Sequence, residues 1–86
     1  MKLKQGYVLR EVADTWVVLP LQGVDLDGMI KLNGSGAFLW RELEKGGDVS
    51  ALVTALTSEY EVAADKAEAD VISFLTLLQS YGCVEN

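Results

Sequence analysis

The side chains that most often carry out chemistry in proteins are scarce in this sequence. It has no histidine and one cysteine, Cys83. Histidine is the usual general base and a frequent metal ligand, so its absence excludes every Cys-His and Ser-His arrangement. A zinc site would have to combine the single cysteine with carboxylates, which is not one of the usual ligand sets. We therefore expect no catalytic centre, no metal and no cofactor.

Two other segments contain residue types that could bind an ion. The acidic residues Asp65, Glu68 and Asp70 fall in the first turns of an expected helix, where negative charge favours the positive end of the helix dipole. Helix stabilisation explains them without a metal. Residues 33–36, NGSG, precede another expected helix, where glycines can cradle an anion. They match neither the dinucleotide fingerprint nor the phosphate-binding loop, so a tight turn is the better interpretation.

Length and composition indicate one small globular domain over residues 1–86. Half of the 86 residues are apolar, which is typical of a folded chain. A lone cysteine suits a reducing compartment, and we interpret Cys83 as a small hydrophobic residue at a helix end. The N-terminal residues lack a secretory signal, and no apolar run is long enough to cross a bilayer. We expect a cytoplasmic protein.

The charge balance argues against two classes of partner. Seven basic residues stand against 13 acidic ones, which gives a formal net charge of -6. Nucleic acids and anionic membranes both need a positive surface that concentrates them. We expect neither as a partner of this chain.

Strand-like segments come first along the chain. Residues 7–12 (YVLREV) and 15–20 (TWVVLP) are rich in β-branched and aromatic side chains, and the two residues between them predict a hairpin turn. Pro20 ends the second strand, because proline has no N–H for a ladder hydrogen bond. Residues 28–32 predict a third short strand. Together these segments predict a three-stranded antiparallel sheet.

Helical periodicity replaces the strand pattern after the third strand. Asn33 or Ser35 can cap the first helix, and Asp48 can cap the second. Glycines follow the first and third helices, where they favour termination. The expected helices cover residues 33–45, 48–60 and 63–81. A sheet followed by three helices predicts an α+β domain.

The third helix is more apolar than a single core-facing stripe requires. Its apolar residues span an arc of roughly 220°, whereas a helix with one face in the core needs about 100°. Ile72 lies on one flank of the main stripe, and Leu77 and Tyr81 lie on the other. Either the rest of the domain covers both flanks, or one flank borders a groove that a partner fills.

The expected third strand indicates a groove of the same kind. Ile30 and Leu32 share one face of it, and Met29 and Lys31 share the other. Lys31 is its only charged residue and it has no proline, so its edge is weakly protected against pairing. Such an edge beside an apolar helix would accept an extended peptide through backbone hydrogen bonds.

Three long segments, in order, carry a resemblance to a known family. They are GYVLREVADTWVVLP, GMIKLNGSGAFLWRELEKGGDVSALVTALTSEYEV and AEADVISFLTLLQSYGCVE. The most specific features are the Leu32-Asn33 start, the Gly36-Ala37 pair and Trp40, followed by the link before the third helix. Over nearly its whole length the chain resembles the PqqD family, small proteins also called RiPP precursor peptide recognition elements.

The resemblance implies a winged helix-turn-helix-like fold and a non-catalytic role. In that family the leader of a ribosomally made precursor peptide docks as an extra strand on the third strand, against the third helix. A partner enzyme, often a radical SAM protein, then modifies the core of the peptide. PqqD itself serves pyrroloquinoline quinone biosynthesis, but the resemblance is to the broad family, so lasso, thioether and other products stay open. The implied peptide-binding residues are Met29, Ile30, Lys31, Leu32, Val71, Ile72, Leu75, Leu78 and Gln79.

Three alternatives stay open. Core packing is the alternative role for each apolar residue of that set. A winged helix could instead belong to a DNA-binding transcriptional regulator, although the third helix carries Lys66 against three acidic residues. The free strand edge could also pair with a second copy, which would give a homodimer in place of a monomer.

Overall fold

The computed structural model describes residues 2–20 and 30–85 and combines a sheet with three helices. The antiparallel strands lie in the order β2 (Tyr7–Val12), β3 (Thr15–Pro20) and β4 (Ile30–Leu32). The helices are α1 (Gly34–Glu44), α2 (Val49–Glu59) and α3 (Ala64–Ser80). None of these helices is both long and apolar enough to cross a membrane. The expected α+β order, a three-stranded antiparallel sheet followed by three helices, is confirmed.

The β2–β3 hairpin forms where the sequence predicts it. Ala13 and Asp14 have φ angles of 49° and 66°. Positive φ at both turn residues belongs to the two-residue type I′ turn, whose twist matches that of the flanking strands. The resulting register places Arg10 opposite Val17, and Val17 in turn opposite Lys31 of β4.

A polar cap fixes the start of α1. Asn33 Oδ1 accepts hydrogen bonds from the backbone N–H of Gly36 at 2.7 Å and from the Ser35 hydroxyl at 3.0 Å. Asn33 is therefore the cap, and Ser35, the other predicted candidate, lies in the first turn. Asp48 caps α2 as predicted, accepting from the backbone N–H of Ala51 at 2.8 Å.

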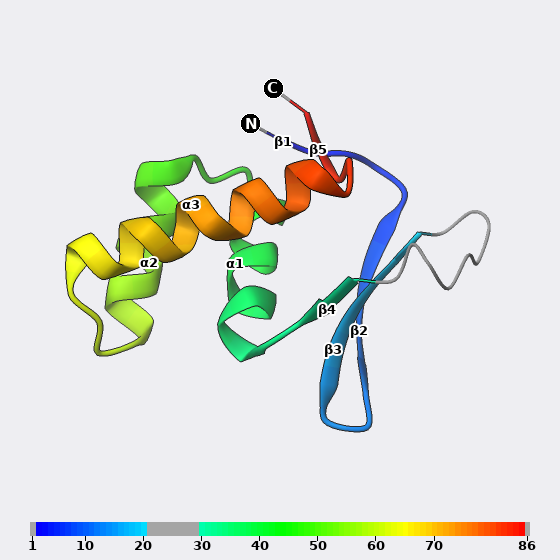
Figure 1. Cartoon of the computed structure of the whole chain (residues 1–86), viewed down its shortest axis with the longest axis horizontal. Coiled ribbons are helices and arrows are strands. Elements are labelled where there is room, and N and C mark those ends of the chain that lie inside the picture. The colour runs from blue at the N-terminus through cyan, green and yellow to red at the C-terminus, as the bar shows by residue number, and fades with distance from the viewer. Residues whose placement is uncertain (1, 21–29, 86) are drawn as a thin grey trace.

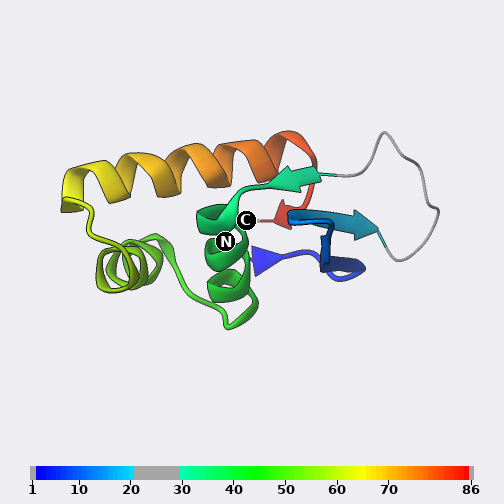
Figure 2. The same ribbon diagram turned by 90° about the horizontal axis from the view of Figure 1, so that it is seen from below.

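The helices and the inner face of the sheet share one hydrophobic core. Figure 1 shows the three helices in one half of the molecule and the β2–β3 hairpin in the other, with β4 leading from the sheet into α1. In Figure 2, α3 runs along one side of the molecule and α1 lies beneath it. The largest fully buried side chains come from the sheet, from each helix and from the C-terminal segment: Trp40, Ile30, Leu52, Leu78, Val18, Val71 and Cys83.

A second, two-stranded sheet joins the two ends of the chain, β1 (Lys2–Leu3) and β5 (Val84–Glu85) (Figure 1). Lys2 pairs with Glu85, and the N–H of Lys4 donates to the carbonyl of Cys83 at 2.8 Å. The sequence does not predict these strands, because two residues are too few to show an alternation of polar and apolar side chains. Cys83 is fully buried, and this burial raises the pKa of its thiol.

Candidate functional site

β4 is an edge strand that pairs with β3 on one side. Within residues 2–20 and 30–85, no strand pairs with its other side. The outward backbone groups on that side therefore have no ladder partner. Ile30 and Leu32 are 2% and 7% exposed and face the core, whereas Lys31 between them is exposed. The strand thus offers a hydrogen-bonding edge next to apolar side chains.

A hollow of about 600 Å³, here named the β4–α3 groove, lies beside β4 and one flank of α3. Its apolar lining consists of Leu32, Leu39, Leu56, Val62, Phe74 and Leu77. Its other lining residues are Lys31, Asn33, Ser35, Gly36, Tyr60, Lys66, Asp70 and Ser73. An apolar surface with a few polar groups is typical of sites that take up part of a ligand.

One flank of α3 forms the long wall of the β4–α3 groove. Lys66, Asp70, Ser73 and Leu77 follow one another at intervals of three or four residues, so they point to the same side of the helix. Leu77 is 40% exposed although it is a large apolar residue. This flank therefore presents apolar surface that the domain itself leaves partly uncovered.

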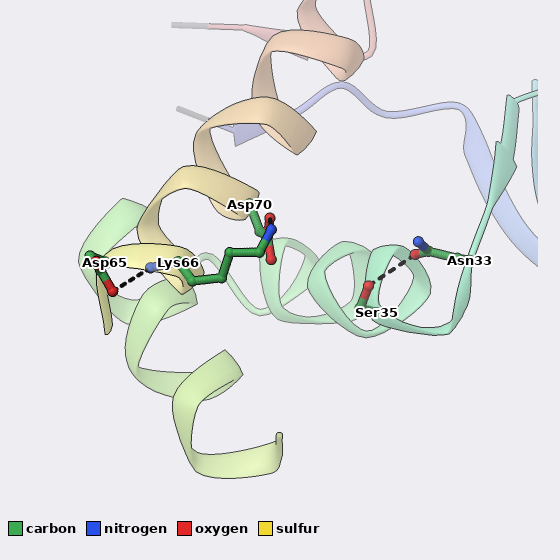
Figure 3. Close-up of polar contacts among 5 residues, drawn as sticks. All are labelled: Asn33, Ser35, Asp65, Lys66 and Asp70. Atoms are coloured by element: carbon green, nitrogen blue, oxygen red, sulfur yellow. Dashed lines mark hydrogen bonds and ion pairs between the residues drawn. The ribbon is translucent and has the colours of Figure 1, made fainter. Parts of the chain in front are cut away.

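Two polar pairs border the groove (Figure 3). On α3, Lys66 Nζ lies 2.7 Å from Asp70 Oδ1, and the two side chains retain 66% and 44% of their accessible surface. At the start of α1, the pair is Asn33 and Ser35. Because the Lys66–Asp70 pair is well exposed, it contributes little to stability. Its main local effect is to balance the positive charge of Lys66.

Tyr60 and Val62 contribute to the groove from the link between α2 and α3. The Tyr60 ring packs edge-to-face against Phe38, with ring centroids 5.7 Å apart, and Tyr60 is 41% exposed. This is a favourable geometry for two aromatic rings. Tyr60 is thus an aromatic side chain held in place at the groove but still accessible.

Two of the strand residues implied by the family resemblance line the groove. Lys31 and Leu32 line it, and Ile30 is buried in the core beside it. Met29 lies outside the described residues. The strand half of the implied site therefore coincides with the free edge of β4.

The five helix residues implied by the resemblance are placed differently. Val71, Leu75 and Leu78 are at most 4% exposed and belong to the core, which is the alternative role considered for them. Ile72 and Gln79 are exposed, but helical geometry places them on the flank opposite Leu77. None of the five lines the β4–α3 groove.

The residues that do line the groove from α3 carried weak signals in the sequence. Leu77 is identified there as a flank residue, but both flanks of the helix carry apolar residues, so periodicity alone does not show which flank faces β4. In the sequence analysis, the presence of Asp70 near the start of the helix is explained by the helix dipole. The link at residues 60–62, in contrast, belongs to the segment that carries the family resemblance.

Comparison with known proteins identifies the family and the fold. The family model of coenzyme PQQ synthesis protein D (PqqD) matches residues 15–84. A solved structure of TbiB1 in complex with the TbiA(beta) leader peptide is 29% identical with a TM-score of 0.82, and the match covers 100% of this chain and 96% of that one. A lasso peptide synthetase B1 complexed with the leader peptide is 25% identical with a TM-score of 0.79, covering 99% and 96%. No curated protein matches the sequence. The match to the family model over most of the chain shows that this protein belongs to the PqqD family.

Proposed function

We propose that this protein is a non-catalytic peptide chaperone that binds the leader of a ribosomally synthesised precursor peptide. The observation that carries the proposal is the free edge of β4 beside the partly apolar β4–α3 groove. Both structural neighbours were solved with a leader peptide bound, which supports a leader as the ligand.

The leader would bind as an additional strand on β4. Its backbone N–H and C=O groups would pair with the outward groups of β4, and alternate side chains would enter the groove. Leu77 and Phe74 would then contact the entering side chains from the α3 side. Burial of apolar surface at Leu77 would add affinity that backbone hydrogen bonds alone do not supply.

The role of binding is to present the attached core peptide to a modifying enzyme. Holding the leader makes the encounter between enzyme and core nearly intramolecular, which raises the effective concentration without new contacts to the core. The expected partner is a radical SAM enzyme or, by analogy with the second structural neighbour, the rest of a lasso peptide synthetase. We place this step in the cytoplasm.

Nuclear magnetic resonance titration tests the proposal. The TbiA(beta) leader peptide of the structural neighbour is a suitable probe. We expect the largest amide shifts at residues 30–33 and along the groove flank of α3, from Lys66 to Leu77. Residues of β1 and β5 serve as the internal control and should shift little, because they do not line the groove.

Two results would contradict the proposal or its geometry. Absent or evenly distributed shifts with every leader would remove the peptide-binding function. Shifts centred on Ile72 and Gln79 would keep the function but move the site to the opposite flank of α3.

A further inference from the structure

The middle residue of β4 differs in direction and charge from its neighbours. Ile30 and Leu32 are buried against the helices, whereas Lys31 is exposed, as expected for a residue on the other face of the sheet. On this outer face the register forms one cross-strand row of Arg10, Val17 and Lys31, in which both cations are exposed and Val17 between them is buried. The row contains two cations and no carboxylate, in a chain whose net charge is -6.

A strand added to the free edge of β4 would extend this row by one residue. Cross-strand partners project to the same face, so the peptide residue paired with Lys31 would lie on the outer face, next to the lysine. The peptide residues before and after it would turn towards the β4–α3 groove. Lys31, which borders the β4–α3 groove at the free edge of β4, is therefore positioned to contact a peptide side chain that points away from the apolar lining of the groove.

The two charged residues that line the groove from α3 have opposite charges. Lys66 is paired with Asp70 at 2.7 Å, so its positive charge is matched within α3. Within the described residues, Lys31 makes no ion pair. Opposite charges on directly paired strand residues stabilise the pair, and like charges destabilise it.

We propose that Lys31 selects an acidic side chain at the peptide position paired with it, flanked on both sides by residues that enter the groove. This inference rests on the proposed function and adds a specificity determinant to it. Lysine on an edge strand can also serve to discourage strand pairing between molecules. That role alone predicts no preference for acidic peptide residues.

Selection from a displayed library of randomised 12-residue peptides tests the inference. The bait is the full chain in three forms: wild type, Lys31→Glu and Lys45→Glu. Lys45 is a matched control, because its replacement makes the same change in net charge but lies outside the β4–α3 groove. Peptides bound to wild type should share an acidic position between two apolar ones. Lys31→Glu should select a basic residue at that position, and Lys45→Glu should retain the acidic one.

Affinity measurements on one selected peptide complete the test. Replacing its acidic residue by the neutral amide should weaken binding to wild type by up to about fivefold at low salt. The difference should shrink as ionic strength rises, since the pair is exposed. The same replacement should leave binding to Lys31→Glu unchanged or stronger.

Each outcome decides between the hypotheses. Alternating apolar peptides without a charge switch at Lys31→Glu would overturn the inference and leave the proposed function standing. Failure of every form to select peptides would overturn the proposed function and the inference with it.

Discussion

Leu77 and Leu78 are adjacent on α3 but have different environments. Leu78 is fully buried in the core, whereas Leu77 is 40% exposed and lines the β4–α3 groove. Neighbouring helical residues point about 100° apart, so one step along the chain moves a leucine from the core to the groove wall. Substitutions at these two positions can therefore distinguish the effect of core packing on stability from the effect of the groove wall on peptide binding.

We predict different effects for alanine at these two positions. Leu78→Ala should lower the free energy of unfolding by about 2–5 kcal/mol, because it leaves a cavity in the core. Leu77→Ala should cost less than about 1 kcal/mol of stability but weaken leader binding severalfold, because it removes apolar contact area. Urea unfolding and calorimetric titration measure the two quantities. Equal peptide affinity for Leu77→Ala and wild type would exclude Leu77 from the site.

Asn33 links the edge strand to the first helix. Its Oδ1 caps α1 through the N–H of Gly36, and a Cβ added at Gly36 would lie 3.1 Å from that oxygen and 3.3 Å from Leu32 Cβ. A side chain at position 36 would therefore have to shift the cap or the strand by a few tenths of an ångström.

Two cap variants test whether this junction matters for binding. Asn33→Ala and Asp48→Ala each remove one side-chain cap and should each cost about 1 kcal/mol of stability. Asn33 lines the groove and Asp48 does not, so only Asn33→Ala should also weaken leader binding. Thermal unfolding and peptide titration on both proteins provide the comparison. A matching loss of affinity in Asp48→Ala would show that general destabilisation is the cause.

At the scale of secondary structure, the sequence predicted the three-stranded sheet and the three helices but missed β1 and β5. The β2–β3 hairpin and the cap of α2 follow from local signals, namely β-branched runs around two turn residues and Asp48 before an apolar stripe. β1 and β5 have two residues each, and their pairing depends on chain ends that meet only in the folded protein. Local patterns carry no information about such a contact.

The α3 side of the candidate site was harder to predict for a related reason. The main stripe of α3 was identified correctly as apolar, and it includes the buried residue Val71. Ile72 and Leu77 on its two flanks are similarly exposed, at 49% and 40%. Which flank faces β4 depends on how the helix is rotated against the sheet, and that rotation is a property of tertiary packing.

The burial of Cys83, which directly precedes β5, should make stability sensitive to alkaline pH. Burial raises the pKa of this thiol in the folded state. The contribution of the buried, protonated thiol to the free energy of unfolding is therefore fully present below the unfolded pKa of about 8.5. This contribution is lost as pH rises through the higher pKa of the folded state. We predict that the free energy of unfolding declines as pH rises above about 8.5.

Cys83→Ala provides the control for this prediction. It should be less stable at neutral pH, since it loses buried volume, but its stability should change less over the alkaline range. Urea unfolding at several pH values measures both effects. An equally steep decline in the variant would assign the pH dependence to other groups, such as Tyr7, whose pKa is also raised by burial.

The charge of the whole molecule sets which partners it attracts. The net charge is -6, and α3, the helix that would enter a DNA groove, carries Lys66 as its single basic residue. That lysine is paired with Asp70, so the helix offers no unbalanced positive charge to a phosphate backbone.

We predict no binding to duplex DNA. Fluorescence anisotropy with a labelled random-sequence duplex should stay flat up to high protein concentration, even at about 50 mM salt, where electrostatic binding is strongest. A leader peptide titrated into the same protein sample shows that the fold is intact. A salt-sensitive rise in anisotropy would reopen the alternative of a transcriptional regulator.

The pairing of Lys2 with Glu85 brings the first and last strands together, and neither strand lines the β4–α3 groove. A tether attached at either end would therefore emerge from the same region of the surface and leave the binding site open. Joining the two ends by a short linker and cutting the chain elsewhere should also preserve the fold. The domain is thus suited to fusion with a catalytic module in either orientation, or to insertion into a surface loop of one.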